Sequence, residues 1–175
     1  MIGHFAIDYT NIAGLAAGAL FCVFLIVAAV GDIKSFTITN SFNMLFFSSF
    51  FIVAPILGLG LDDIFYHLMV AAAAFMICFA LFALGLFGGG DVKLVGATAI
   101  WLGSAPMMVY AFYTAIFGGV LALILLTARF ISSKAGLPRN PKWLRQLLRK
   151  HSAIPYGVAL CIGGICALPQ VTWLH

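Results

Sequence analysis

Two of the five aspartates stand in segments whose residue types could support acid–base chemistry. Asp32 lies in the segment GDIK (31–34), and Asp91 lies in GGGDVK (88–93). Two carboxylates within a few ångströms of each other cannot both ionise cheaply, so such a pair shares one proton. One carboxylate can then act as a base on a water molecule while the protonated one polarises a peptide carbonyl. The pKa values would belong to the pair rather than to either residue.

Other reactive constellations are absent from the sequence. The five aspartates are the only acids, so an H-E-x-x-H zinc motif is excluded. The sequence has no phosphate-binding G-x-x-x-x-G-K-[ST] loop and no Ser or Cys in a Gly-rich nucleophile turn. The four cysteines stand in apolar stretches and form no C-x-x-C motif, so we interpret them as buried apolar residues. Of the catalytic chemistries considered, only acid–base chemistry by carboxylates remains.

Each aspartate also has an ordinary structural interpretation. Asp91 could be the N-cap of a following helix and accept hydrogen bonds from the N–H groups of Lys93 or Leu94, which is the commoner role for such a residue. Asp32 would oppose the macrodipole at a helix C-terminus, but it could be a loop carboxylate near Lys34. Acids at a membrane boundary are functional candidates by default. The two residues alone leave both interpretations open.

The three glycines that precede Asp91 favour a functional role. Gly88, Gly89 and Gly90 would each cost roughly 1 kcal/mol inside a helix. Their succession indicates a backbone that turns tightly or that another chain approaches closely. An aspartyl protease needs such an approach because it holds its substrate extended against its own backbone. A flexible turn between helices is the alternative.

The composition places these residues in a membrane protein. Hydrophobic residues make up 64% of the chain and charged residues 8%, with a mean hydropathy of +1.15. A soluble domain carries roughly 25% charged residues, so these few could not cover a surface facing water. The net charge of +4 comes from basic residues at the ends of apolar stretches and between Lys134 and Lys150. This distribution indicates contact with membrane lipid and no nucleic-acid partner.

Charged residues divide the chain into apolar stretches of membrane-spanning length. Four of them have the ~20 residues that one helical pass requires, and the fifth, Leu94–Ala128, is too long for one pass. The sequence GSAP (103–106) would end one helix there and begin another. The small residues Ala71–Ala74 predict close helix packing. The five stretches are Tyr9–Gly31, Ser35–Leu61, Ile64–Gly90, Leu94–Ala128 and Ser152–His175.

We therefore predict an all-α fold, a polytopic bundle of about six transmembrane helices in a single domain over residues 1–175. With six passes, all nine basic residues fall on one side, which the positive-inside rule assigns to the cytoplasm. Asp32 and Asp91 fall on that side at similar depth. Asp8, Asp62 and Asp63 fall on the other side, together with both termini. The fourth helix, which starts near Asp91, is short, and the sequence leaves open whether it crosses the whole bilayer or only part of it.

The one sizeable polar segment is a basic loop at about 132–152. Within it, PKWLRQLLRK (141–150) places its apolar residues on one helical stripe. This pattern suits a helix that lies in the headgroup layer. A solvated loop that enforces the topology is an equally good interpretation, and neither gives the segment a catalytic role.

Three blocks of the sequence resemble the type IV prepilin peptidases, which belong to the G-x-G-D group of membrane aspartyl proteases. DIKSFTITN (32–40) resembles that family's aspartate followed closely by Ile-Pro-Asn. GGGDVKL (88–94), with the helix after it, resembles its G-G-G-D-x-K-L block, and IPYG (154–157) resembles the block that opens its last helix. The order and the topology also fit, so the resemblance covers most of the chain. The second block is highly specific, and the third is moderately so.

The resemblance implies roles for individual residues. Asp32 and Asp91 would be the catalytic pair. Two positions depart from the family pattern, because Thr39 replaces a proline and Val158 stands where a second proline is common. The expected motif and supporting residues are Asn40, Gly88, Gly89, Gly90, Lys93, Pro155, Tyr156 and Gly157.

The resemblance also implies a reaction, which is removal of the short basic leader of prepilins or pseudopilins at the cytoplasmic boundary of the bacterial inner membrane. The cut would follow a glycine just before the hydrophobic helix of the substrate. That helix would dock in the bilayer against the bundle. No metal or organic cofactor is implied, and the expected partners are the substrate, membrane lipid and the pilus assembly machinery.

The short segment between Asp32 and Asn40 indicates which subclass of the family the chain resembles. Larger members carry there a cysteine-rich zinc-binding insertion associated with N-methylation of the mature pilin. This chain has neither the length nor the cysteines. It therefore resembles the minimal subclass that serves tight-adherence (Flp-type) pili, and we expect no N-methyltransferase activity.

Two other functions compete with this one. The first is a G-x-G-D protease of the signal-peptide-peptidase kind, in which a tyrosine usually precedes the first aspartate, whereas Gly31 precedes Asp32 here. The second is a small proton- or cation-coupled transporter that uses the two aspartates as a relay. A relay favours acids near mid-membrane and broken spans in two corresponding halves, and the sequence has no such repeat.

Overall fold

The structure is a computed structural model that describes residues 9–135, 141–149 and 154–174, and all its regular elements in these ranges are helical. This confirms the predicted all-α class. The elements are α1 (Tyr9–Ser35), α2 (Asn40–Ile56), α3 (Leu61–Ala83), α4 (Gly89–Leu102), α5 (Ser104–Ala135), α6 (Lys142–Leu147) and α7 (Gly157–Ala167), followed by the short 3₁₀ helices η1 (Leu168–Gln170) and η2 (Thr172–Leu174).

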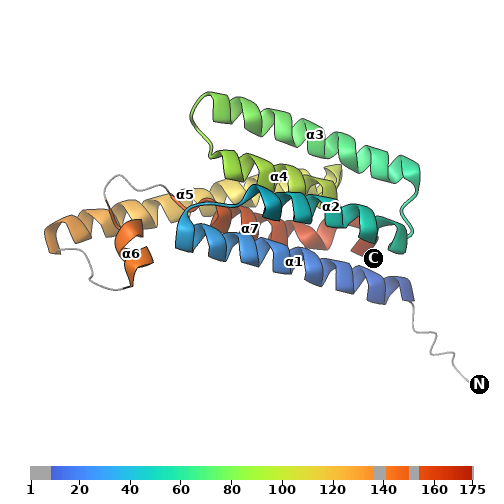
Figure 1. The fold of residues 1–175 in the computed structure, drawn as a ribbon, viewed down its shortest axis with the longest axis horizontal. Helices are drawn as coiled ribbons and strands as arrows, with labels where there is room; N and C mark the ends of the chain where they lie inside the picture. The colour runs from blue at the N-terminus through green and yellow to red at the C-terminus, as the bar shows by residue number, and fades with distance from the viewer. Residues whose placement is uncertain (1–8, 136–140, 150–153, 175) are drawn as a thin grey trace, which may run out of the picture.

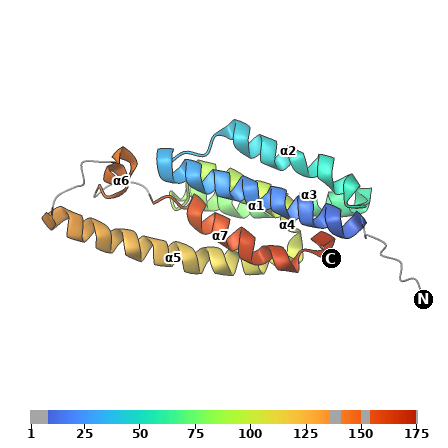
Figure 2. The same cartoon turned by 90° about the horizontal axis from the view of Figure 1, so that it is seen from below.

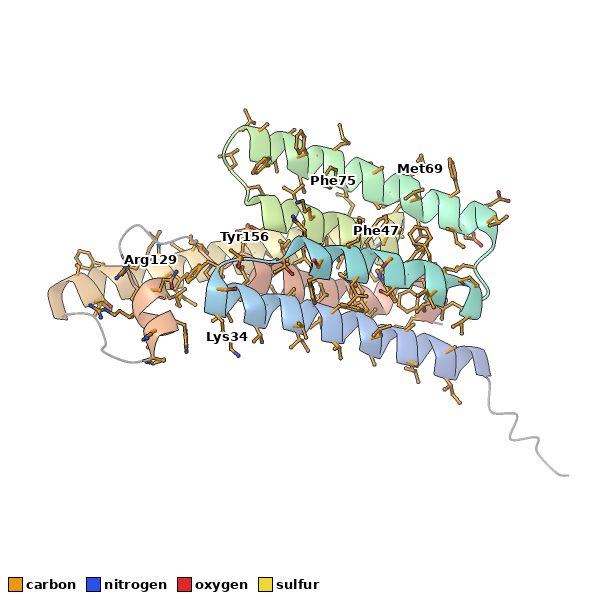
Figure 3. All side chains as sticks on the ribbon, in the orientation of Figure 1. Lys34, Phe47, Met69, Phe75, Arg129 and Tyr156 are labelled. Carbon is orange, nitrogen blue, oxygen red and sulfur yellow. The ribbon has the colours of Figure 1, made fainter. Side chains whose placement is uncertain are left out.

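Successive long helices run in alternating directions along one common axis (Figures 1 and 2). The end of α1 and the starts of α4 and α7 therefore meet at one end of the bundle, where α6 also lies. Lys34 and Arg129 lie at this end (Figure 3), which we call the basic end. Helix α3, whose first turn carries Asp62 and Asp63, starts at the opposite end.

Among the described residues, three helices are long and apolar enough to cross a membrane, by length and composition: Ile12–Ser35, Leu61–Ala83 and Ser104–Ser133. Asn40–Ile56 and Gly157–Gln170 are shorter apolar helices. Helix α4 has 14 residues, which span roughly 21 Å at ~1.5 Å per residue, less than the ~30 Å hydrocarbon core. The number of passes and the sidedness stay predictions. The predicted position of Asp8, both termini, and residues 136–140 and 150–153 lie outside the described residues.

Several predicted boundaries shift in the structure. Helix α1 continues to Ser35, so Asp32 lies inside the last turns of the helix and not after it. Helix α5 continues to Ala135, so the basic loop begins later than residue 132, and α6 covers only part of 141–150. The break at Gly103 is confirmed, because α4 ends at Leu102 and Gly103 has a φ of +70°.

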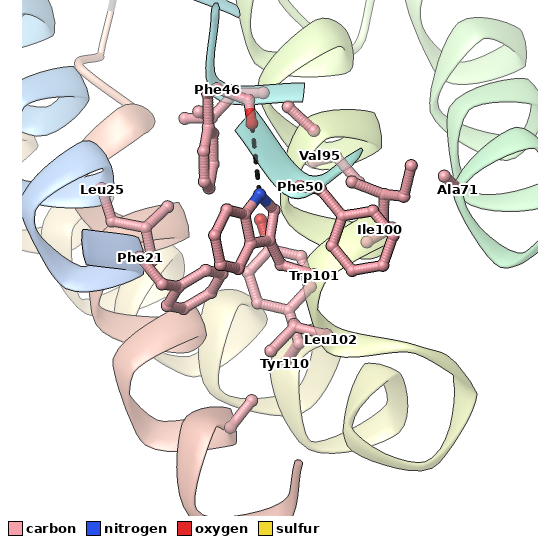
Figure 4. Packing of buried hydrophobic residues seen from close by; sticks show 14 of the residues in the cluster. Phe21, Leu25, Phe46, Phe50, Ala71, Val95, Ile100, Trp101, Leu102 and Tyr110 are labelled. Atoms are coloured by element: carbon pink, nitrogen blue, oxygen red, sulfur yellow. Dashed lines mark hydrogen bonds between the residues drawn. The ribbon is translucent and has the colours of Figure 1, made fainter. Parts of the chain in front are cut away.

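Helix α4 lies at the centre of the bundle, and every residue from Leu94 to Leu102 is buried. Its last full turn carries Trp101, which packs among Phe21, Phe46 and Phe50 (Figure 4). The Trp101 indole N–H donates to the Phe46 carbonyl at 3.1 Å. The Trp101 carbonyl accepts from the indole N–H of Trp173, at 2.8 Å. These contacts with α1, α2 and the C-terminal segment fix α4, and with it the residues at its N-terminus.

Helix α3 is attached to the bundle chiefly through α4. Ala71 and Ala74 are buried in this interface, as the small-residue pattern predicts. The Phe75 ring lies against Gly96, where an added Cβ would come within 3.4 Å of it. Helix α3 packs on α4, and open space remains on its two other sides, one between α3 and α2 and one between α3 and α5.

Candidate active site

The structure brings the two aspartates into one cavity at the basic end. Asp32 comes from the last turns of α1, and Asp91 comes from the first turn of α4. The cavity has a volume of about 280 Å³. Its remaining walls come from the connection between α1 and α2, the glycine segment and the residues before α7. The lining residues are Asp32, Phe36, Thr37, Ile38, Gly88, Gly89, Gly90, Asp91 and Ile154.

The N-terminus of α7 holds the Asp32 carboxylate. Asp32 is only 6% exposed, and its Oδ2 accepts a hydrogen bond of 2.7 Å from the backbone N–H of Gly157. The first N–H groups of a helix have no partner within the helix and favour an anion. This donor offsets the unfavourable position of an anion at the C-terminal end of α1. A Cβ at Gly157 would lie 2.9 Å from Asp32 Oδ2, so the contact requires glycine.

Asp91 lies in the first turn of α4, but it is not the N-cap. Helix α4 begins at Gly89 with Gly88 as its N-cap, so the N-cap interpretation of Asp91 was wrong. The Asp91 carboxylate instead reaches back to the backbone of Gly88. An added Cβ on Gly88 would lie 2.7 Å from Asp91 Oδ2, so glycine permits this close approach.

The glycines do not form the tight turn that their succession suggested. Gly89 and Gly90 are helical, and Gly88 has an ordinary φ of −79°. The close approach, however, is present. An added Cβ on Gly89 would lie 3.4 Å from the Phe82 ring, and one on Gly90 would lie 3.5 Å from Ile38. The glycines therefore let the first turn of α4 pack against its neighbours and leave its backbone accessible from the cavity.

The surroundings of Asp91 favour its protonated form. Asp91 lies outside the three long apolar helices. Burial, and next the charge of Asp32, raise the pKa of Asp91 to about 7, although the hydrogen bond from the Gly88 backbone acts in the opposite direction. Near neutral pH the pair can therefore hold one proton, as the acid–base chemistry of two carboxylates requires.

Two of the predicted supporting residues meet beside the cavity. The Lys93 ammonium donates to Asn40 Oδ1 at 2.6 Å, which ties the first residue of α2 to the first turn of α4. Thr39, at the position where the family pattern has proline, is the N-cap of α2, and its hydroxyl accepts from the Phe42 N–H at 3.4 Å. This departure from the pattern therefore supplies a helix cap.

Asn43 is a residue of this site that sequence reasoning missed. It is 4% exposed, and its side-chain N–H donates to the Gly90 carbonyl at 3.2 Å, directly before Asp91. Its Oδ1 has no hydrogen-bond partner in the described part of the chain. The available signal was an amide one turn after Asn40 in an otherwise apolar helix, because a buried amide needs a partner.

The predicted block at 154–157 packs beside the same cavity. Pro155 is buried, and the Tyr156 ring packs edge-on against Phe87, with centroids 5.4 Å apart and an interplanar angle of 64°. The Tyr156 hydroxyl lies against Gly118 of α5, where a side chain would overlap it. Among the described residues, no group of three or more His, Cys, Asp or Glu side chains could hold a metal ion.

Comparison with known proteins gives two matches. The Type IV leader peptidase family matches residues 19–123, a range that includes Asp32 and Asp91. The prepilin leader peptidase/N-methyltransferase of Bacillus subtilis (strain 168) is 30% identical over 157 residues, which cover 87% of this chain and 55% of that protein. The chain thus spans little more than half the length of that relative. No solved structure matches the chain significantly.

Proposed function

The chain belongs to the type IV leader peptidase family, and on this premise we propose that it is a membrane aspartyl endopeptidase acting on prepilin or pseudopilin substrates. Asp32 and Asp91 would be its catalytic pair. One observation carries the proposal: two carboxylates from distant parts of the sequence line the same cavity. The raised pKa of Asp91 supports it, because the pair can then hold one proton near neutral pH.

The two carboxylates have distinct surroundings and therefore distinct roles. The Gly157 N–H stabilises ionised Asp32, which can take a proton from water as that water attacks the scissile carbonyl carbon. Protonated Asp91 donates its proton to the carbonyl oxygen. When the tetrahedral intermediate collapses, the C–N bond breaks, the oxygen returns its proton to Asp91, and the leaving amine takes the proton that Asp32 holds. The pair then again holds one proton.

The substrate class follows from the family and from the position of the cavity. The proposed cut removes a short basic leader at the membrane boundary. Asp32 and Asp91 are the only acidic residues that the described part of the chain places at the basic end, so a basic leader would find its attraction at the cavity. By the positive-inside rule, this end would face the cytoplasm of a bacterial inner membrane.

We further propose that the chain acts as a peptidase without N-methyltransferase activity. Only Phe36–Thr39 connect α1 to α2, which leaves no room there for a zinc-binding insertion. This short connection supports assignment to the minimal subclass that serves tight-adherence pili. The pilus assembly machinery is then a further partner, next to the substrate and the surrounding lipid.

The test is leader removal in cells that co-express the protein with a candidate prepilin whose basic leader ends in glycine. We expect Asp32→Asn and Asp91→Asn each to abolish the mobility shift on a gel while the protein still inserts. The matched control is Asp62→Asn, because Asp62 is an exposed acid at the opposite end of the bundle. Full processing by either of the first two variants would remove the catalytic assignment.

A further inference from the structure

Two apolar grooves flank α3. The α3–α5 groove has a volume of about 590 Å³ and includes Ala73 and Ala111 on its walls. The α2–α3 groove has a volume of about 550 Å³ and includes Ala72 and Gly96. Both grooves run alongside α4, and each is large enough to hold part of an apolar polypeptide chain. A substrate helix that reaches the two aspartates from the bilayer could use either one.

We propose that the α3–α5 groove receives the apolar helix of the substrate and that the α2–α3 groove does not. This inference rests on the proposed peptidase function and adds to it the surface on which the substrate docks. Three features of the structure distinguish the two grooves: their position around α4, the residues that lie between each groove and the two aspartates, and the chemistry of their lining.

The first feature is the face of α4 on which each groove lies. Val95 lines the α3–α5 groove, and it follows Asp91 by four residues, so both lie on one face of the helix. Lys93 and Gly96 line the α2–α3 groove. Lys93 is two residues from Asp91, which turns it about 200° away around the helix. A substrate helix in the α2–α3 groove would have to cross the N-terminus of α4 to reach Asp91.

The second feature is the pair of aromatic residues that lies between the groove and the two aspartates. Phe87 and Tyr156 line the α3–α5 groove, and they pack edge-on against each other. Each directly precedes a glycine that contacts a catalytic candidate: Gly88 contacts Asp91, and Gly157 contacts Asp32. Since Ser104 also lines the groove, it extends along the whole of α4, roughly 21 Å.

The third feature is the chemistry of the lining. In the part of the chain that the structure describes, no charged residue lines the α3–α5 groove, and its alanines on α3 and α5 allow a helix to approach closely. The α2–α3 groove includes Lys93, whose hydrogen-bond acceptor is the uncharged Asn40 amide. This positive charge would repel a basic leader.

Ala72 and Ala73 provide a matched pair for the test. They are consecutive exposed alanines on α3, and each lines a different groove. Both can accept a large side chain into open space. We expect Ala73→Trp to lower the initial rate of leader removal at least about tenfold, equivalent to ~1.4 kcal/mol, and Ala72→Trp to change it less than about twofold.

A photo-crosslinking amino acid at each of these positions gives an independent measurement. In the uncleaving Asp91→Asn background, position 73 should crosslink to the prepilin and position 72 should not. Crosslinking to prepilin at 72 alone, a rate loss confined to Ala72→Trp, or lipid adducts alone at 73 would each overturn the groove assignment. These outcomes leave the peptidase function standing if the wild type removes the leader. A wild type that removes no leader would overturn both proposals.

Discussion

The contact between Gly157 and Asp32 offers a sharp test of how the proposed catalytic pair is positioned. In Gly157→Ala, the new methyl carbon would lie 2.9 Å from Asp32 Oδ2 and 3.0 Å from Asp32 Cβ. Asp32 Oδ2 can rotate, but Asp32 Cβ is fixed to the backbone of α1, so rotation of the carboxylate alone does not relieve both contacts. The carboxylate must therefore move away from the Gly157 N–H, which now lies 2.7 Å from it.

The size of the effect follows from the hydrogen bond that is lost. A hydrogen bond to a charged group contributes roughly 1.5–3 kcal/mol, and its loss would reduce the rate by about 10- to 150-fold if the bond is needed throughout the reaction. Displacement of the base from the attacking water acts in the same direction. We therefore expect Gly157→Ala to lose at least about tenfold in leader removal.

The assay measures initial rates of leader removal by purified protein in detergent, together with the thermal unfolding midpoint. Gly119→Ala is the matched control, since an added Cβ at Gly119 meets nothing within 4 Å. A helical Gly→Ala change at such a site should keep or raise stability. Wild-type rates for Gly157→Ala would refute the idea that the α7 N-terminus positions Asp32. A parallel loss in Gly119→Ala would show that the assay reports general disturbance.

Three further predictions concern the cavity and its supports. Leader removal should decline as the pH rises above about 7, because the pKa of Asp91 is raised to about 7 and the protonated carboxyl is present only below that value; initial rates over roughly pH 5–9 measure this. Asn43→Ala should slow leader removal by roughly 2- to 12-fold, because the hydrogen bond to the Gly90 carbonyl is worth ~0.5–1.5 kcal/mol. The measurement compares the initial rate of this variant with that of Ser48→Ala, which changes an exposed position on the same helix. Thr39→Pro should retain leader removal, because Thr39 has a φ of −68° that proline also adopts, and the lost cap should lower the stability of α2 by about 1 kcal/mol, measured by thermal unfolding.

Each of these predictions has a result that contradicts it. A rate that keeps rising to pH 9 would show that the reaction does not need protonated Asp91. Equal rates for Asn43→Ala and Ser48→Ala would show that the Gly90 carbonyl needs no side-chain donor. Loss of activity in a folded Thr39→Pro protein would show that the Thr39 hydroxyl does more than cap α2.

The extension of α4 at its N-terminus illustrates where local sequence rules give way to tertiary packing. An acidic residue after glycines predicts a helix that starts at the acid, because glycine disfavours the helical state. In the structure Gly89 and Gly90 are helical and pack against Phe82 and Ile38. No local pattern identifies these neighbours. The glycines are used for their small volume, and Asp91 thereby lies in the first turn of α4 and not at its N-cap.

The sequence by itself indicated the membrane environment and named the candidate acids. Its scarcity of charge indicates a membrane bundle, and GSAP (103–106) marks the break between α4 and α5, because these properties depend only on composition and neighbouring residues. The sequence alone also singles out Asp32 and Asp91 as the candidate acids, since few other reactive groups exist in the chain. Motif resemblance added the supporting residues, of which Asn40 and Lys93 meet in space.

Only the tertiary structure decided how these groups are held. The Gly157 N–H reaches Asp32, Asn43 reaches the Gly90 carbonyl, and α3 leaves a groove on each side. Each of these features joins segments far apart in the chain. Their formation depends on which helix faces pack together, and α4, buried on every side, carries no amphipathic pattern that would reveal its neighbours.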